Sequence, residues 1–436
     1  MSVTTSVYLS AAHARFDLSS EADIQRATAA GLLIEGHFLD VKRLIPPGKP
    51  KNLELARDIA SFAIDGGTIL IGLDEQTDGT VIPSPQALDG LAERVEQVAN
   101  MIPDPPVPVR SVRIPTASDA RVGYLIIHVP KSSQAPHMVD GRYLARGDKT
   151  KRYLTDPEVR RLHAELATNR LDADALLRAE FNRDPIPSSV RQKGHLFLVA
   201  QPQTSRPDLI SDLIDGDRWQ ERVFAFVREH AYSEVVNSAL QRADAFDFKP
   251  EVASASVVID TRAHGVAIPT PPIGRGRAYT PGQYAHPEDA AELELHDNGA
   301  IRLFLGRLTD HLPKNVHGER QQQHVLFDVA AVMYARRFLG ILAGIAEHGY
   351  LGTWTLGAGA TGVLGARSFR IVDDPRSFED GTPYGEDTYV QSTTSSYEEL
   401  TTKPGAIADR LIGRLLRTVG TRRTYIQALQ APSDGL

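Results

Sequence analysis

The stretch 52–75 changes from a helical to a strand-like hydrophobic period across one pair of glycines. Leu55, Ile59 and Phe62 recur at helical spacing, and Gly66-Gly67 ends that pattern. The run that follows, TILIGLDE, is apolar and rich in isoleucine, which is typical of a buried strand. A chain that alternates such segments packs helices against a sheet. We therefore expect an α+β fold.

The same alternation continues along the chain. Helical patterns occupy 21–32, 85–102 and 155–170, and strand patterns occupy 37–45, 109–114, 121–130 and 141–147. A chain of 436 residues exceeds what one hydrophobic core usually serves, so two domains are expected. We expect an N-terminal extension at 1–20, a mixed-sheet domain at 21–165, a helical linker at 166–190 and a second, α/β domain at 191–436.

Three local patterns mark the second domain. Asn298-Gly299 between alternating strands predicts a type I′ hairpin turn. The segment 321–348 predicts a long buried helix, and 352–372 predicts two further strands. Residues 357–362, GAGATG, fit the spelling of a dinucleotide site, but a strand pattern follows them where that site needs a helix. A glycine-rich hairpin is the simpler interpretation.

Composition excludes several classes of function. The chain has no cysteine, which excludes disulfides, thiolate zinc sites and thiol nucleophiles. Its net charge of −7 is not that of a chain that is basic throughout. The longest apolar stretches are interrupted by charged residues, and the first twenty residues have no continuous apolar segment. We expect no membrane association and a cytoplasmic location.

The stretch LIEGHFLDVKRL, 33–44, places two acids and a lysine within one strand-like run. Alternation along a strand puts Asp40 and Lys42 on one face, with Val41 turned into the core. Glu35 joins them only if a turn or bulge near Gly36 re-aims its side chain. An amphipathic surface strand would carry the same letters, because alternating polar residues face water.

Asp74 and Glu75 lie at the end of the next buried strand and would meet Asp40 if the two strands are neighbours. Carboxylates brought together repel one another unless a cation lies between them, and Mg²⁺ accepts one or two carboxylates together with phosphate and water. The residues thus leave open a metal centre at a phosphodiester or a scaffold for binding without cleavage.

A basic run follows in the same domain. Between residues 131 and 152 the cationic side chains are Lys131, Arg142, Arg146, Lys149, Lys151 and Arg152, against Asp140 and Asp148. A patch of this size holds several backbone phosphates, with affinity that falls as salt rises. A solvated loop of mixed charge is the alternative interpretation.

The order of these blocks resembles the Schlafen-type AlbA-like domain. That family's pattern is a Glu, a Glu-Phe-Lys after four residues, an Ala-Phe-Ala-Asn helix end, Gly-Gly and a Gly-Val-Asp-Asp strand end. Here it is matched by Glu35, by 40–42 (DVK), by 61–64 (SFAI), by Gly66-Gly67 and by 72–75 (GLDE). Three positions depart from the pattern, with Asp40 for Glu, Glu75 for Asp and Ile64 for Asn.

The resemblance implies a function and a set of residues. It assigns a nuclease centre to Glu35, Asp40, Lys42 and Glu75, with Glu35, Asp40, Asp74 and Glu75 as ligands of Mg²⁺ or Mn²⁺. It implies an endoribonuclease that cleaves structured RNA such as tRNA, in bacterial stress or antiviral defence. It also implies a homodimer, since vertebrate relatives join two lobes around an RNA stem and one lobe is recognisable here. The alternative from the same resemblance is a DNA- or RNA-binding regulator without cleavage.

Overall fold

A computed structural model of the whole chain describes residues 6–7, 16–132, 134–147, 149–168, 173–203, 209–242, 259–270, 272–277, 279, 288–316, 319–347, 352–373 and 381–431. The chain divides into two compact units. Unit 1 comprises Met1–Arg170 with Gly349–Gly352, and unit 2 comprises Leu171–His348 with Thr353–Leu436. Both units contain helices and mixed or antiparallel sheets, which confirms the α+β class.

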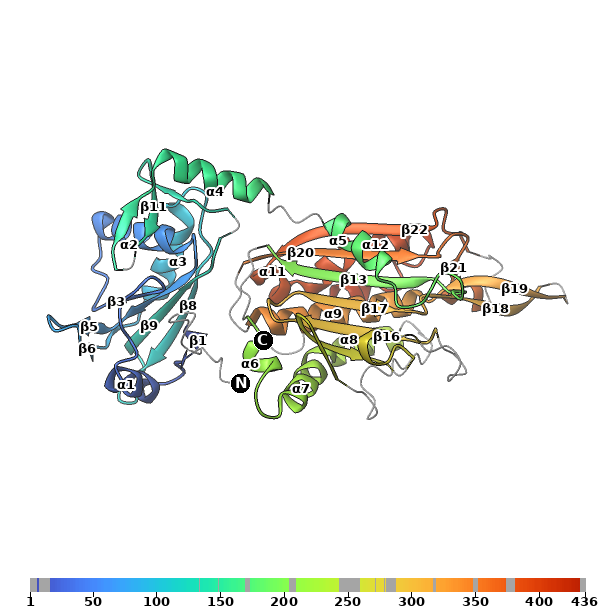
Figure 1. Cartoon of the computed structure of the whole chain (residues 1–436), viewed down its shortest axis with the longest axis horizontal. Coiled ribbons are helices and arrows are strands. Elements are labelled where there is room, and N and C mark those ends of the chain that lie inside the picture. Colours follow the sequence, from blue (N-terminus) through green and yellow to red (C-terminus); the bar gives the residue numbers. More distant parts are fainter. Residues whose placement is uncertain are drawn as a thin grey trace. The chain divides into compact units, whose positions relative to one another are not determined.

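Unit 1 is built on one mixed sheet (Figure 1). Its edge strand β3 (Leu39–Lys42) runs parallel to β4 (Gly67–Ile71), and β4 is antiparallel to β9 (Val122–Val129). Strands β7 (Gln86–Ala87) and β8 (Arg110–Pro115) also pair with β9. After β4 the chain forms a hairpin of β5 (Leu73–Glu75) and β6 (Val81–Pro83).

Helices cover both faces of this sheet because its strands are apolar on both sides. Residues Ile69 and Ile71 pack with α2 (Lys49–Phe62) and α3 (Leu91–Met101), whereas Leu70 packs with α1 (Glu21–Ala29). Neighbouring positions of β4 thus point to opposite layers, as the strand period of two requires.

A small antiparallel sheet completes unit 1. It consists of β10 (Met138–Val139), β11 (Arg142–Arg146) and β12 (Lys151–Tyr153), and α4 (Asp156–Thr168) follows it. Leu144 of β11 belongs to the hydrophobic cluster of α2 and α3. This contact fixes the basic run against α2. A two-stranded ladder of β1 (Ser6–Val7) and β2 (Phe16–Asp17) precedes the domain.

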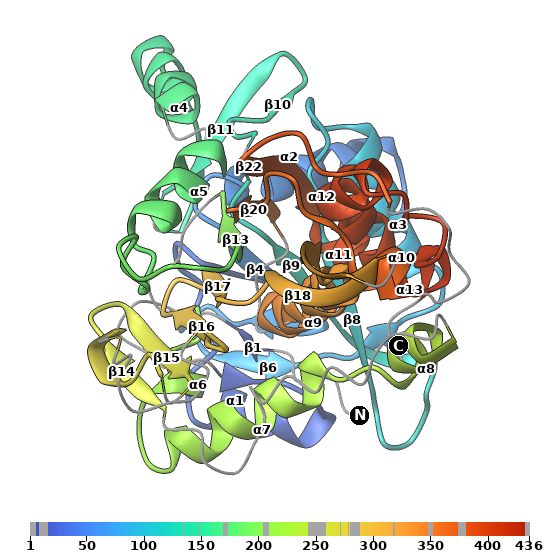
Figure 2. The same cartoon turned by 90° about the vertical axis from the view of Figure 1, so that its right-hand side faces the viewer.

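Unit 2 is built on a seven-stranded antiparallel sheet. Its order is β14 (Asp260–Arg262), β15 (Gly265–Pro269), β16 (Ala291–His296), β17 (Ile301–Leu305), β13 (His195–Pro202), β20 (Thr353–Thr361) and β22 (Thr388–Ser396). Figure 2 shows α5 (Ala173–Asn182) on one side of these strands and α9 (Asp328–Glu347) with α12 (Pro404–Thr418) on the other.

The remaining described elements of unit 2 surround that core. The helices are α6 (Ser211–Ile214), α7 (Trp219–Ala231), α8 (Glu234–Arg242), η2 (Arg275–Arg277), α10 (Phe369–Asp373), α11 (Tyr397–Thr402) and α13 (Ile426–Gln430). A second sheet contains β18 (Thr309–Val316), β19 (Glu319–Leu326) and β21 (Arg367–Ser368).

Several expectations for the second half need correction. Residues 321–326 belong to strand β19, and the helix begins at Asp328. The expected linker contributes α5, whose Leu177 is buried against β13 and β20. Of the two strands expected at 352–372, β20 is long, while β21 has two residues and leads into α10.

The glycines of 357–362 form neither a dinucleotide loop nor a hairpin. Gly357 and Gly359 lie along β20, where a side chain on Gly359 would meet Phe181 of α5 at 2.5 Å, and Gly362 directly follows the strand. The hairpin at Asn298-Gly299 is present, but its turn is not type I′. Positive φ among described non-glycine residues is confined to Asp140, Arg218 and Arg277, so the left-handed residue is Gly299 alone.

Helix α9 is long and apolar enough to cross a membrane by length and composition. Of its most apolar window, 83% is buried inside the protein. That burial is typical of the core helix of a folded domain.

Candidate functional site

Strand β3 presents Asp40 and Lys42 on the face that α2 covers. Val41 packs in the opposite layer with α1, so the alternation expected from the sequence is present. Lys42 Nζ lies 2.8 Å from Asp40 Oδ2. Asp40 is 5% exposed, which places this pair inside the domain instead of on a solvated strand.

An unbroken row of alternating charges extends from this pair. Lys42 Nζ also lies 3.1 Å from Oδ2 of Asp58 on α2, and Lys151 Nζ of β12 lies 2.5 Å from Asp58 Oδ1. At the other end, Arg146 Nη2 lies 3.2 Å from Asp40 Oδ1. We call Arg146, Asp40, Lys42, Asp58 and Lys151 the ionic row. It joins β11, β3, α2 and β12.

The ionic row sets the charge states of Asp40 and Lys42. Burial raises the pKa of Asp40, but the combined lowering by Lys42 and Arg146 outweighs it, so the pKa lies below its ordinary value. Burial lowers the pKa of Lys42, but Asp58 and Asp40 raise it above the usual range. Both groups are therefore charged at neutral pH.

Glu35 reaches the same place from the loop before β3. Its Oε1 accepts the N–H of Val41 at 3.1 Å, on the edge of β3 that no strand covers among the described residues. Burial raises the pKa of Glu35 and the Val41 N–H lowers it by less, while the adjacent Asp40 carboxyl and the charge of Glu75 add smaller increases, so that the pKa is about 7. Glu35 is thus close enough to both Asp40 and Glu75 to be repelled by their charges.

Asp74 is not brought to the same side as Glu75. The two are neighbours on β5, so their side chains point in opposite directions. The N–H of Gly72 donates to Lys42 O at 2.9 Å, which sets β5 beside the end of β3.

Arg146 requires a correction, because it is not part of an exposed basic patch. Its side chain is 3% exposed. Its Nε donates to Gly36 O at 3.0 Å, its Nη2 donates to Leu39 O and Asp40 Oδ1, and its guanidinium lies 4.4 Å from the centre of the Phe62 ring. In this position it caps the edge of β3 and is out of reach of a phosphate.

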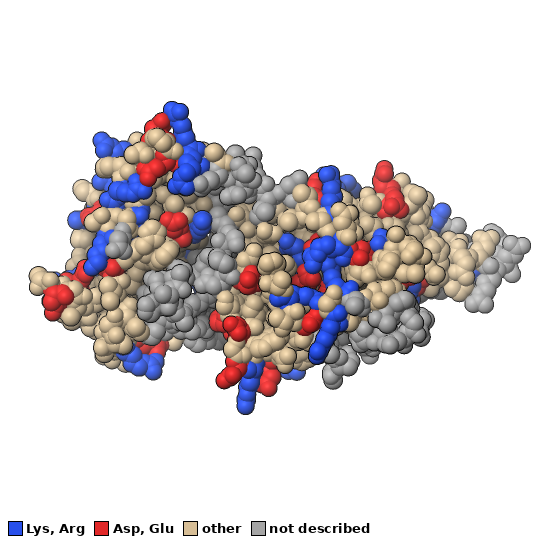
Figure 3. All heavy atoms as spheres, in the orientation of Figure 1, with Lys and Arg blue, Asp and Glu red and all other residues tan. Residues whose placement is uncertain are grey.

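The other cations of the basic run lie at the surface. Lys131, Arg142, Lys149 and Arg152 are exposed, and Lys151 is 28% exposed in its side chain. Arg152 pairs with Glu158 at 2.7 Å, and Arg142 lies over the ring of Tyr153. In Figure 3, blue side chains are frequent over the part of unit 1 that carries α2, α4 and β11.

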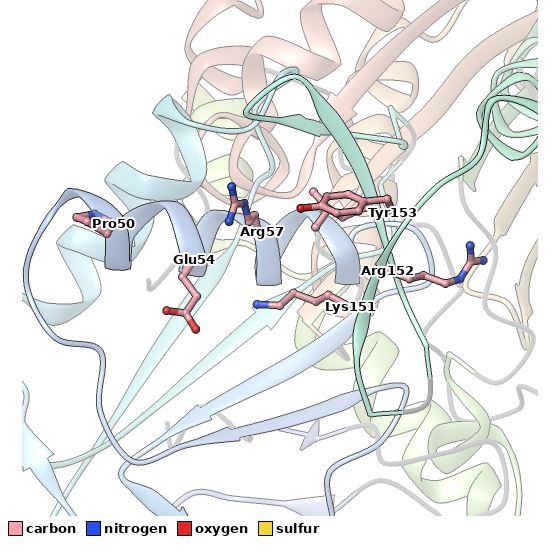
Figure 4. A pocket seen from close by; sticks show the side chains of 7 residues that line it. Pro50, Glu54, Arg57, Lys151, Arg152 and Tyr153 are labelled. Atoms are coloured by element: carbon pink, nitrogen blue, oxygen red, sulfur yellow. The ribbon is translucent and has the colours of Figure 1, made fainter.

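Two residues of this region were not expected from the sequence. Asp58 stands on the apolar face of α2 between Leu55 and Phe62, and a charge at such a position is the signal that would have revealed it. Tyr153 is a half-exposed aromatic inside a basic run. Together with Lys151 it lines a pocket of about 380 Å³ beside α2, seen in Figure 4.

The acids fit a divalent cation only with help from a substrate. Among the described residues, no three His, Asp or Glu side chains are grouped as a complete protein metal site would require. Both oxygens of Asp40 already face a cation. Glu35 and Glu75 remain as oxygen donors, and Mg²⁺ is usually bound by one or two carboxylates completed by water and substrate phosphate.

The mixed sheet, the clustered acids and the adjoining surface cations together define a domain suited to phosphodiester ligands. Residues 35–155 match the family described as Schlafen, AlbA_2, so this part of unit 1 is a Schlafen AlbA_2 domain. The match indicates a function that involves nucleic acid. It leaves out α1, which the fold includes in unit 1. No curated protein matches the chain.

Proposed function

We propose that unit 1 binds structured RNA, such as tRNA, and cleaves it as an endoribonuclease with Mg²⁺ or Mn²⁺. The observation that carries this proposal is the half-buried position of Glu35 beside Asp40 and within the field of Glu75, where burial first and these two acids next raise the pKa of Glu35 to about 7. Perturbed carboxyls of this kind are common at sites that bind cations or transfer protons.

Each residue has a distinct part in this proposal. Glu35 and Glu75 would hold the cation, which when bound supplies an activated water and stabilises charge on the phosphate. Lys42, kept charged by Asp40 and Asp58 and 25% exposed, offers a positive charge to the same phosphate. With the cation bound, Glu35 would remain a carboxylate, because the positive charge lowers its pKa.

The test is cleavage of tRNA by the purified full chain in Mg²⁺, in Mn²⁺ and in EDTA. We expect cleavage with either cation, none in EDTA, and a loss of at least about a hundredfold in Glu35→Gln, because the cation loses one of its two carboxylate ligands. Glu96→Gln, which changes an exposed acid on α3, is the matched control. Equal activity of Glu35→Gln and the control would defeat the assignment.

Cation binding has a readout that does not depend on activity. A cation between Glu35 and Glu75 would stabilise the charged carboxylates, so millimolar Mg²⁺ should lower the pKa of Glu35 from about 7. The carboxyl carbon resonance of Glu35, followed by NMR through a pH titration with and without Mg²⁺, measures the shift. If Mg²⁺ leaves the titration midpoint of Glu35 unchanged, Glu35 does not bind the cation and this part of the proposal fails.

The ionic row favours a second candidate, a nucleic-acid-binding regulator without cleavage. Asp40 is already neutralised by Lys42 and Arg146, so it stabilises the fold without any metal. Under this candidate the protein binds RNA or DNA and leaves it intact in every cation tested. The cleavage assay therefore separates the two candidates.

The proposal includes an assembly and a location. One Schlafen AlbA_2 domain per chain offers one lobe to an RNA stem, and a homodimer would supply the second. We place the protein in the cytoplasm, where tRNA is available, and a role in stress or antiviral defence would follow from tRNA cleavage.

A further inference from the structure

The pocket of Figure 4 lies between the first turns of α2 and the strands β11 and β12. It is lined by Pro50, Glu54, Arg57, Leu144, Lys151, Arg152 and Tyr153. It contains none of the acids proposed for cleavage. Its volume of about 380 Å³ suits a small ligand or one residue of a polymer.

The ionic row leaves an excess of positive charge at this pocket. The row contains three cations, Arg146, Lys42 and Lys151, and two carboxylates, Asp40 and Asp58. Arg146 and the two carboxylates are buried, whereas Lys151 lines the pocket. Lys42 and Lys151 both keep some exposure, and Lys151 is the member of the row that lines the pocket, so an anionic group there would complete the alternation.

Other charges of the lining are locally balanced. Glu54 lies 2.9 Å from Lys51, Arg57 lies 3.0 Å from Asp140, and Arg152 pairs with Glu158. Arg152 also points away from α2 in Figure 4, as the residue between Lys151 and Tyr153 must on a strand. Lys151 is paired as well, but it shares its partner Asp58 with Lys42, so it is the cation that the pocket most directly offers.

An exposed aromatic ring stands beside that cation. Tyr153 is 50% exposed and extends toward α2 on the same side of β12 as Lys151. The guanidinium carbon of Arg142 lies 4.6 Å from the centre of its ring. A ring so positioned is a stacking platform, and a neighbouring guanidinium adds a cation–π contact.

We infer that this pocket holds one unstacked nucleotide of a single-stranded RNA segment, with its base on Tyr153 and its phosphate at Lys151. A lone anion would need no aromatic ring, and a neutral aromatic ligand would make no use of Lys151, which shares the single carboxylate of Asp58 with Lys42. Loops and ends of structured RNA present such nucleotides, which proteins stack on aromatic side chains. The inference extends the RNA-binding part of the proposed function.

The stacking half is tested by binding of a fluorescein-labelled RNA pentamer to the full chain, followed by anisotropy in EDTA. Tyr153→Ala should weaken binding about 5- to 150-fold, as loss of one stacked base does, while Tyr153→Phe retains it. Tyr232→Ala, at a tyrosine 58% exposed in unit 2, is the matched control. Equal binding by Tyr153→Ala and the control, or equal losses in Tyr153→Ala and Tyr153→Phe, would overturn the inference.

The phosphate half is tested with AMP and adenosine in the same buffer by calorimetry. The wild-type protein should bind AMP more tightly than adenosine, and Lys151→Ala should remove that preference. Lys403→Ala, at an exposed lysine of unit 2, should keep it. We expect Lys151→Ala to fold, because Asp58 keeps its ion pair with Lys42, and circular dichroism checks this. A preference for AMP that survives in folded Lys151→Ala contradicts the assignment.

These outcomes are independent of cleavage. If Tyr153→Ala loses pentamer binding and the wild-type protein cuts no tRNA, the pocket is supported and the nuclease proposal fails. Cleavage by the wild-type protein with unchanged pentamer binding in Tyr153→Ala supports the nuclease and defeats the pocket.

Discussion

At the scale of single residues, Asp58 is the member of the ionic row whose loss should most affect stability. It is 1% exposed and accepts two lysines, one from β3 and one from β12. A buried carboxylate with two cationic partners ties three elements together. Its removal leaves two ammonium groups facing each other across the space that it filled.

We predict that Asp58→Ala lowers the free energy of unfolding of unit 1 by about 2–3 kcal/mol, below the range for fully buried pairs because both lysines keep some exposure. Both tryptophans of the chain, Trp219 and Trp354, lie in unit 2. The urea unfolding transition of unit 1, followed by circular dichroism, should therefore move to lower urea concentration. The transition followed by tryptophan fluorescence, which reports on unit 2, should not move.

Asp89→Asn is the control, since Asp89 is exposed and lies 3.5 Å from Arg113 at the surface. Its effect should stay within about 0.5 kcal/mol. If Asp58→Ala behaves like this control, the ionic row does not stabilise the domain.

Glu35 gives the domain a specific pH dependence. Its pKa is raised from 4.5 to about 7 in the folded protein, so between these values the folded state binds more protons than the unfolded state. Stability must then fall as pH rises through this window. We predict that Glu35→Gln removes that fall.

The measurement is the urea midpoint by circular dichroism at pH 5 and pH 8 for both proteins. The wild-type midpoint should drop more than that of Glu35→Gln, since glutamine does not titrate. Because other groups titrate in both proteins, the difference between the two drops is the decisive quantity. Parallel drops would show that Glu35 is not perturbed.

At the scale of elements, the notable feature is how the edge of β3 is closed. An open edge exposes unpaired backbone groups and invites association with other strands. Here Glu35 accepts from Val41 N, and Arg146 donates to Leu39 O. The loop before β3 and the strand β11 therefore cover an edge that no strand pairs with among the described residues.

We predict that Arg146→Ala destabilises unit 1 by about 2–4 kcal/mol, because it uncovers two backbone carbonyls and leaves Asp40 with one cation. Lys149→Ala, three residues later and exposed, should leave stability within about 0.5 kcal/mol. Chemical unfolding followed by circular dichroism compares the two. If the Arg146→Ala protein is as stable as the wild type but binds RNA more weakly, Arg146 takes part in RNA binding and its structural assignment is wrong.

At the scale of the whole molecule, the proposed homodimer sets the expected mass and salt dependence. Light scattering at micromolar concentration should give a protein mass of twice the 47.7 kDa chain, to which bound tRNA adds its own mass. Replacing Lys149, Lys151 and Arg152 together by alanine should weaken binding to unrelated stem-loops alike and reduce the salt slope by about two to three, since each phosphate contact releases counterions.

A single-chain mass with RNA binding intact would defeat the dimer and leave the nuclease proposal standing. An unchanged salt slope in the triple variant would show that RNA binds to another surface of the protein. Arg146 is omitted from this variant because its loss would destabilise the domain and obscure the effect on binding.

The sequence by itself determined the α+β class, the family of 35–155 and the shared face of Asp40 and Lys42. These depend on local periodicity and on short motifs, in which neighbouring residues carry the information. The tertiary structure decided the rest. Arg146 lies 106 positions from Asp40 along the chain, so its burial could not be predicted from a run of basic letters. The same holds for Asp58, whose partners come from two different strands, and for the glycines of β20, which make room for α5. Whether a charge meets water, a phosphate or a buried partner depends on which distant segment packs beside it.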